Sequence, residues 1–164
     1  KEFQTPAVFV KLYKSYVLPR LEYASVAWNA LSGTDTKRLE AVQKRALHII
    51  HNGFLRKKLL YDYDTLLQYF HLHPLATRRS IADALFLYKC VHARVDSPLL
   101  LSLLNFCIPR AAFRNPPVFY VKRFCPSDPI TRCQILLNSL PPTCDIFHAS
   151  SASLKRDVIS FLHQ

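Results

Sequence analysis

Glycine occurs only twice in the 164 residues of this chain, at Gly33 and Gly53. Phosphate-binding loops of the GxGxxG and Walker types need several glycines within a few residues, so the sequence excludes both. Tight β-hairpins commonly use glycine or Asn-Gly pairs, and the scarcity of glycine therefore disfavours an all-β fold. Because 50% of the residues are apolar, the chain can still bury a substantial core. We expect a mainly α-helical protein.

The helical pattern is clearest in the first third of the chain. A helix is expected to begin at Thr5-Pro6, where a hydroxyl cap precedes a proline in the first turn, and Pro19 should break or kink it. The run 21–28 is apolar on nearly every side, so it should be buried. Glu22 lies inside this run, and a carboxylate there needs a cationic or backbone donor nearby.

A second helix is expected over residues 35–51, with Asp35 as its cap and an αL stop at Asn52-Gly53. At 100° per residue its apolar residues fall on one side: Leu39, Val42, Ala46, Ile49 and Ile50. Basic and imidazole side chains fall on the opposite side: Lys37, Arg38, Lys44, Arg45, His48 and His51. Across the first two helices we expect a structural core of Leu12, Tyr13, Leu21, Glu22, Tyr23, Trp28, Leu39 and Val42.

The remaining residues contain further helical patterns and one stretch of different character. We predict a helical bundle of about six to seven helices with a Pro-rich extended arm. The expected division is a helical domain over 1–104, a Pro- and aromatic-rich arm over 105–127, and a C-terminal helical segment over 128–164. Within the arm, 118–121 could form a short strand.

The net charge is +11, and residues 1–60 carry 11 Lys and Arg against four acids. A field of this sign favours a polyanion such as RNA or DNA as the partner. Arg56, Lys57 and Lys58 extend the basic side of the second helix, and we predict phosphate contacts there. The alternative is a domain that is simply basic.

Other sites have weaker support. Tyr61-Asp62-Tyr63-Asp64 has no adjacent aspartates and lies where a helix begins, so we predict no catalytic residue in this chain. His71 with His73, or the set Cys125, Cys133, Cys144 and His148, could in principle ligate a metal. The gaps in the second set are mostly too long for a zinc module, and we expect no metal and no cofactor here.

Aromatic residues interleaved with basic ones in the arm could stack unpaired bases or pack as core: Phe113, Phe119, Tyr120 and Phe124 with Arg110, Arg114, Lys122 and Arg123.

Five cysteines without a CxxC pair, and no secretory signal at the front, favour reduced thiols inside the cell, in the nucleus or cytoplasm, in a protein that is not secreted. No apolar run is long enough for a membrane span, so no membrane partner is expected. The chain begins at Lys1 and contains no methionine. We therefore expect a piece of a longer polypeptide.

Two motifs carry a resemblance to a known family. The segment LYKSYVLPRLEYASVAW, residues 12–28, resembles the L-Y-x-S-x-V-x-P-x-L-E-Y-x-S-x-x-W pattern that follows the polymerase core of non-LTR, LINE- or jockey-like retrotransposon reverse transcriptases. The segment LEAVQKR, residues 39–45, resembles the L-E-x-V-Q-[KR]-R element of the same family. Arg78-Arg79, the segment 96–100, the segment 106–114 and the tail around 145–147 are similar to later elements.

The resemblance implies the thumb and post-polymerase region of an RNA-directed DNA polymerase from a transposable element. It implies that RNA or RNA–DNA duplex and the missing fingers and palm are partners, that Mg²⁺ belongs to the missing polymerase core, and that Arg78 and Arg79 join the nucleic-acid contacts. Whether the chain counts as part of an enzyme depends on that parent, because the catalytic aspartates are absent from it. The alternative hypothesis is a non-enzymatic protein-interaction or structural fragment of a decayed element.

Overall fold

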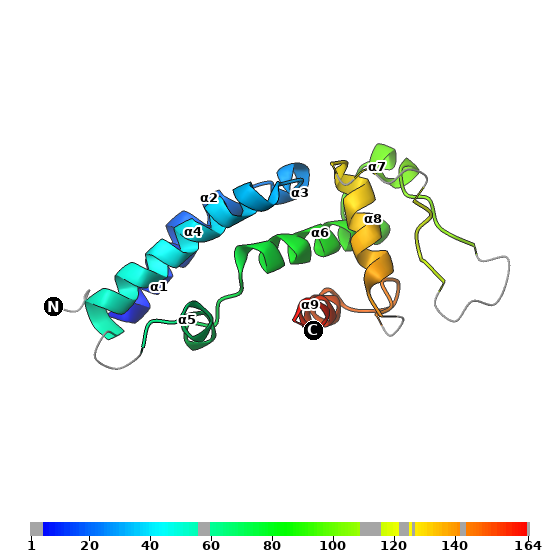
Figure 1. Cartoon of the computed structure of the whole chain (residues 1–164). Helices are drawn as coiled ribbons and strands as arrows, with labels where there is room; N and C mark the ends of the chain where they lie inside the picture. The colour runs from blue at the N-terminus through cyan, green and yellow to red at the C-terminus, as the bar shows by residue number, and fades with distance from the viewer. Residues whose placement is uncertain are drawn as a thin grey trace. The chain divides into compact units, whose positions relative to one another are not determined.

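The structure, a computed structural model, describes residues 5–55, 60–108, 116–121, 125, 127–141 and 144–163 (Figure 1). These residues are mainly α-helical and include no regular β-strand. They form eight continuous helical segments, two of which contain a π-helical turn. The predicted mainly α fold class is confirmed, with one or two helical segments more than expected.

The chain divides into two compact units. The N-terminal unit comprises residues 1–25 and 31–78, and the C-terminal unit comprises 26–30 and 79–164. Each unit contains its own cluster of buried apolar residues. The boundaries expected from composition, after residue 104 and after residue 127, both lie inside the C-terminal unit.

The first helical segment joins α1 (Pro6–Leu12), the π turn η1 (Tyr13–Val17) and α2 (Leu18–Glu22). It begins as expected, with Thr5 extended and Pro6 in the first turn, although the Thr5 side chain makes no capping hydrogen bond. Pro19 does not end the helix. Its missing N–H falls in the first turn of α2, directly after the wider π turn, so the helix continues for three more residues.

The second segment joins α4 (Gly33–Ile50) to the π turn η2 (His51–Leu55). Its cap is Ser32, whose hydroxyl oxygen accepts a hydrogen bond from the Asp35 N–H at 3.1 Å, so the cap lies three residues before the one predicted. The predicted αL stop at Asn52-Gly53 is wrong, because no glycine has a positive φ and the helix continues through both residues.

The core of the N-terminal unit lies between these two segments, α5 (Tyr63–Tyr69) and the start of α6 (Leu75–Val91). Figure 1 shows α1–α2 and α4 running alongside each other, and the Phe9 and Phe54 rings lie 5.2 Å apart where α1 meets η2. The buried apolar residues are Val10, Tyr13, Leu18, Leu47, Ile50, Leu55, Leu66, Leu67, Phe70, Leu72 and Leu75.

Three residues expected in the core are exposed instead: Leu12 (47%), Tyr23 (80%) and Val42 (41%). Leu12 and Val42 each precede a buried residue, and one helical step turns a side chain by about 100°. Tyr23 lies where α2 ends, before Ala24 with a φ of 50°. Tyr13 is buried, whereas the other predicted core residues are partly buried: Leu21, Glu22, Trp28 and Leu39.

The C-terminal unit contains α7 (Pro98–Ser102), α8 (Pro129–Ser139) and α9 (Ser151–Leu162), together with most of α6. Ser97, Asp128 and Ser150 cap these three helices through their side chains. The short α3 (Ser25–Trp28) bridges the change from one unit to the other along the chain.

A buried ion pair and an extended segment complete the C-terminal unit. Arg132 donates to Asp83 at 3.0 Å and to the Val26 carbonyl. In the part of the arm that the structure describes, the predicted strand is reduced to one antiparallel bridge between Phe106 and Phe119.

Candidate nucleic-acid interface

The solvent-facing side of α4 carries a basic face of four residues: Lys37, Arg38, Lys44 and Arg45. All four are exposed, as predicted from the helical pattern. Among the described residues, an ion pair is found for only one of them, since Arg38 donates to Asp35 at 3.2 Å on the helix surface. A surface pair at i,i+3 contributes little and leaves the guanidinium open to water.

Aromatic rings lie at the edge of this basic face. The Lys44 ammonium is 4.9 Å from the centroid of the Tyr63 ring, a cation–π distance that holds the charge in place without neutralising it. His48, one turn further along, meets the Tyr61 ring edge-on with the centroids 4.8 Å apart. The start of the α5 segment therefore lies beside the second half of the basic face.

One residue predicted on this side of the helix does not lie on the exposed basic face. His51 is buried, because it lies at the start of η2 and turns toward the protein rather than toward solvent. Arg56, Lys57 and Lys58 lie outside the described residues, so their predicted phosphate contacts remain a prediction.

The predicted nucleic-acid contacts of Arg78 and Arg79 stay a prediction, and both side chains have partners inside the protein. Arg78 forms a bidentate ion pair with Glu22, with Nη2 and Oε2 2.8 Å apart. This pair provides the cationic partner that the sequence required for Glu22. Arg79 is 2% exposed and donates to Asn29 at 2.8 Å, so its guanidinium lies inside the protein.

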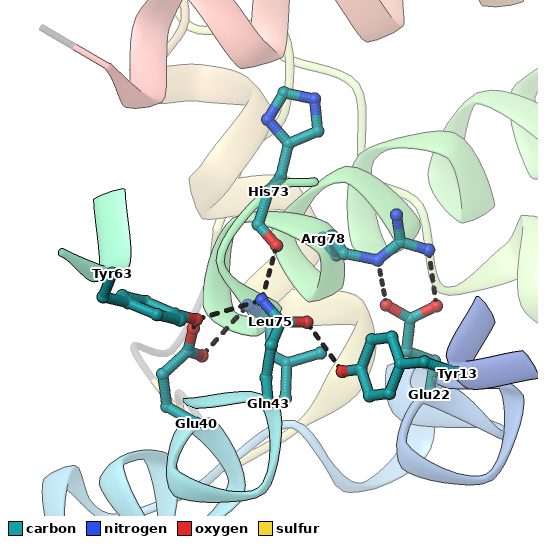
Figure 2. A network of polar contacts seen from close by, with 8 residues as sticks. All are labelled: Tyr13, Glu22, Glu40, Gln43, Tyr63, His73, Leu75 and Arg78. Carbon is teal, nitrogen blue, oxygen red and sulfur yellow. Dashed lines mark hydrogen bonds and ion pairs between the residues drawn. The ribbon is translucent and has the colours of Figure 1, made fainter. Parts of the chain in front are cut away.

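A polar network inside the N-terminal unit holds α4 in position (Figure 2). Gln43, which is fully buried, accepts from the Tyr13 hydroxyl at 2.8 Å and donates to the Tyr63 hydroxyl at 3.0 Å and to the His73 carbonyl at 3.1 Å. Glu40 accepts from the Tyr63 hydroxyl and from the Leu75 N–H. The network joins η1, α4, α5 and the start of α6, and it fixes which side of α4 faces solvent.

The electrostatics of this network follow from its burial. Burial raises the pKa of the Tyr13 and Tyr63 hydroxyls well above the usual value, and the hydrogen bond to Glu40 raises the pKa of Tyr63 further. Both hydroxyls therefore stay protonated and act as donors over the whole neutral range.

Sequence reasoning missed Glu40, Gln43 and Tyr63 as residues that position the site. The available signal was a glutamine three residues after Glu40 in the middle of a helix with an apolar side, where an unpaired amide is costly. Its partners lie 20 to 30 residues away in the sequence, and no local pattern connects them.

The other residues weighed as candidate sites are the aspartates after Tyr61 and the possible metal ligands. Asp62 caps α5 by accepting from the Thr65 hydroxyl at 2.6 Å and from the Thr65 N–H at 2.9 Å, and these two bonds hold the pKa of Asp62 below its usual range. Within the described part of the chain, no three His, Cys, Asp or Glu side chains gather as a metal would require. Burial raises the pKa of the Cys133 thiol to about 12.

Of the aromatic residues weighed for base stacking, Phe119 is buried and Tyr120 is exposed. The other members of that set lie outside the described residues: Phe113, Phe124, Arg110, Arg114, Lys122 and Arg123. The stacking hypothesis for the arm thus loses Phe119, which packs against Phe106 with the ring centroids 5.4 Å apart.

No protein-family model, no curated protein and no solved structure matches this chain. Among the helices of the described residues, none combines the length and the apolar character that crossing a lipid bilayer requires.

Proposed function

We propose that this chain is the thumb and post-polymerase region of a non-LTR retrotransposon reverse transcriptase, and that it grips RNA or RNA–DNA duplex through the basic face of α4. The observation that carries the proposal is the basic face itself. Lys37, Lys44 and Arg45 are exposed on one side of an 18-residue helix, and no acid pairs with them in the part of the chain that the structure describes.

The spacing of these cations suits a phosphate backbone. Lys37 and Lys44 are seven residues apart, which is about 10.5 Å along the helix axis. Two cations this far apart can contact different phosphates of the same strand, because neighbouring phosphates lie closer together than that. Contacts of this kind position a protein on the duplex without reading its sequence, so binding should be largely sequence-independent.

Polymerisation itself would belong to the missing fingers and palm. Two-metal catalysis needs carboxylates held together around Mg²⁺, and the resemblance places those aspartates upstream of residue 1. Under this proposal the coding sequence that precedes Lys1 contains a Y-x-D-D motif, and reading that sequence tests the origin of the chain independently of its binding.

Binding is tested by fluorescence anisotropy with a labelled RNA–DNA hybrid. If the four basic residues each contact one phosphate, the logarithm of the association constant should fall against the logarithm of the salt concentration with a slope of about −3 to −4. Affinity for the hybrid should then be about 100-fold weaker at roughly 200 mM salt than at 50 mM. The double variant Lys44→Glu and Arg45→Glu should bind the hybrid at least tenfold more weakly. The magnitude of its salt slope should be smaller by about 2.

The matched control is Lys155→Glu with Arg156→Glu, which makes the same change of charge at two adjacent exposed residues of α9. This variant should keep most of the affinity. Equal losses in both variants would mean that net charge, and not the basic face of α4, attracts the nucleic acid. Absence of binding at low salt would end the proposal.

A further inference from the structure

A second surface of the N-terminal unit is apolar. A groove of about 390 Å³ lies between the α1–η1 segment and the second half of α4. Its lining residues are Phe9, Leu12, Tyr13, Tyr16, Val17, Ala46, Ile49 and Ile50, none of which is charged. Tyr13 and Ile50 are buried and form its floor.

The walls of the groove expose large apolar side chains to water. On the first helical segment Leu12 and Tyr16 are 47% and 67% exposed, and on α4 Ile49 is 57% exposed. Val42, which is 41% exposed and lies two turns before Ile49 on α4, extends the same side. Contiguous apolar surface of this kind on a soluble unit marks an interaction site.

Helical spacing puts two exposed arginines beside the lining residues, and we take these arginines as the rim of the groove. Arg45 lies three residues after Val42 and four before Ile49, so it stands on the same side of α4. Arg20 is exposed one turn beyond Tyr16. Asp35, at the start of α4, is paired with Arg38 and offsets part of the charge at that end.

We propose that this groove binds an acidic amphipathic helix of a protein partner. The exposed wall from Phe9 to Val17 is about 12 Å long, which accommodates two turns of a helix with anchors at i, i+4 and i+7. Glutamates flanking these anchors would meet Arg45 and Arg20 at the rim. Complementary charge favours this occupant over a neutral or basic helix.

The same features disfavour the other occupants. A second copy of this chain would bring an identical cationic rim against the first, and like charges facing each other oppose association. Five of the eight lining side chains are aliphatic and the Tyr13 hydroxyl already donates to Gln43, so the lining offers base edges little more than the hydroxyl of Tyr16. Arg45 belongs to both surfaces, but Lys37 and Lys44 of the basic face lie away from Ile49 on α4, so changes at Lys37 and Lys44 test the nucleic-acid role separately.

The test uses the whole chain and a fluorescein-labelled designed peptide with leucine at i, i+4 and i+7 and glutamate on both flanks. A control peptide keeps the leucines and replaces every glutamate by lysine. We expect binding in the micromolar range for the acidic peptide, and at least tenfold weaker binding for the basic one.

Two variants locate the contact. Leu12→Gln with Ile49→Gln changes only exposed positions without altering charge, and it should weaken peptide binding at least tenfold while affinity for the RNA–DNA hybrid stays within threefold. Lys37→Glu with Lys44→Glu should do the reverse. Circular dichroism and thermal unfolding verify that both variants stay folded.

Several results would overturn the proposal. One is equal affinity for the acidic and the basic peptide, and another is no binding of either peptide. A third is unchanged affinity for the acidic peptide in the variant Leu12→Gln with Ile49→Gln. Sedimentation equilibrium supplies another: a wild-type dimer that Leu12→Gln with Ile49→Gln converts to a monomer would show that a second copy occupies the groove. Parallel loss of hybrid and peptide affinity in that variant would assign the groove to nucleic acid.

Discussion

Replacing Gln43 by leucine tests the network that orients α4. Leucine has a similar volume, so the change removes hydrogen bonds with little change in packing. It leaves the buried Tyr13 hydroxyl without its acceptor and the His73 carbonyl without its donor. Each group left unpaired in the interior costs about 1–3 kcal/mol, and burying the new apolar side chain returns about 1–2 kcal/mol. We expect the N-terminal unit to lose about 2 kcal/mol of stability.

A double-mutant cycle with Tyr13→Phe separates the hydrogen bond from other effects. Alone, Tyr13→Phe leaves the Gln43 carbonyl oxygen without a donor and should cost about 1 kcal/mol. In the Gln43→Leu background the same change removes an unpaired hydroxyl, so it should be neutral or stabilising. The coupling energy should then be at least about 1 kcal/mol. Tyr16→Phe is the control, since Tyr16 is exposed.

The assay is native-state hydrogen exchange of the amides of α4 and α5. It reports on the N-terminal unit alone, whereas whole-chain unfolding of two units need not follow a single transition. A loss below about 0.5 kcal/mol for Gln43→Leu, or additive effects in the cycle, would refute the argument that this network fixes the exposed side of α4.

Three further outcomes follow from the same structure. Because the pKa values of Tyr13 and Tyr63 are raised in the folded state, both hydroxyls stabilise the fold below about pH 10, and this stabilisation is lost as the pH rises above that value. Absorbance at 295 nm should show two tyrosines that ionise only when the protein unfolds. The double variant Tyr13→Phe and Tyr63→Phe should lack this late-ionising absorbance. With dithionitrobenzoate at pH 8, the exposed thiol of Cys125 should react first, and the buried thiol of Cys133, whose pKa is raised to about 12, should react only when the C-terminal unit unfolds locally. Mass spectrometry of the labelled peptides gives the order of reaction, and labelling of Cys133 before Cys125 would contradict the argument. Arg78→Gln should lower stability by about 1 kcal/mol in urea unfolding, since its ion pair with Glu22 is partly solvated, and leave hybrid affinity unchanged; a tenfold loss of affinity in folded protein would restore Arg78 to the interface.

Features set by local chemistry were predictable from the sequence. The scarcity of glycine and the helical spacing indicated a mainly α fold, and Pro6 marked the start of the first helix. The need of Glu22 for a cationic partner followed from its apolar surroundings, and Arg78 meets that need from 56 residues away. The sequence could require such a partner but could not name it.

Features set by tertiary contacts were not predictable in the same way. Side-chain polarity alone would place valine inward and glutamine outward, yet Val42 is exposed and Gln43 is buried. The burial of Gln43 becomes favourable only once the hydroxyls of Tyr13 and Tyr63 are beside it, and they come from other helices. The exposure of Lys37, Lys44 and Arg45 was still predicted correctly, because these residues lie outside the buried side of α4.

The network also changes what the resemblance to reverse transcriptases can mean. Four polar residues of the two matching motifs, Tyr13, Glu22, Glu40 and Gln43, all bond to partners inside the N-terminal unit. These four positions of the motifs therefore serve the folding of the unit, whereas the exposed motif residues, among them Leu12, Val42 and Arg45, are the ones that a partner could contact. Loss of nucleic-acid binding in a Gln43 variant would consequently measure a misplaced helix, whereas loss in a folded Lys44 and Arg45 variant would measure the interface itself.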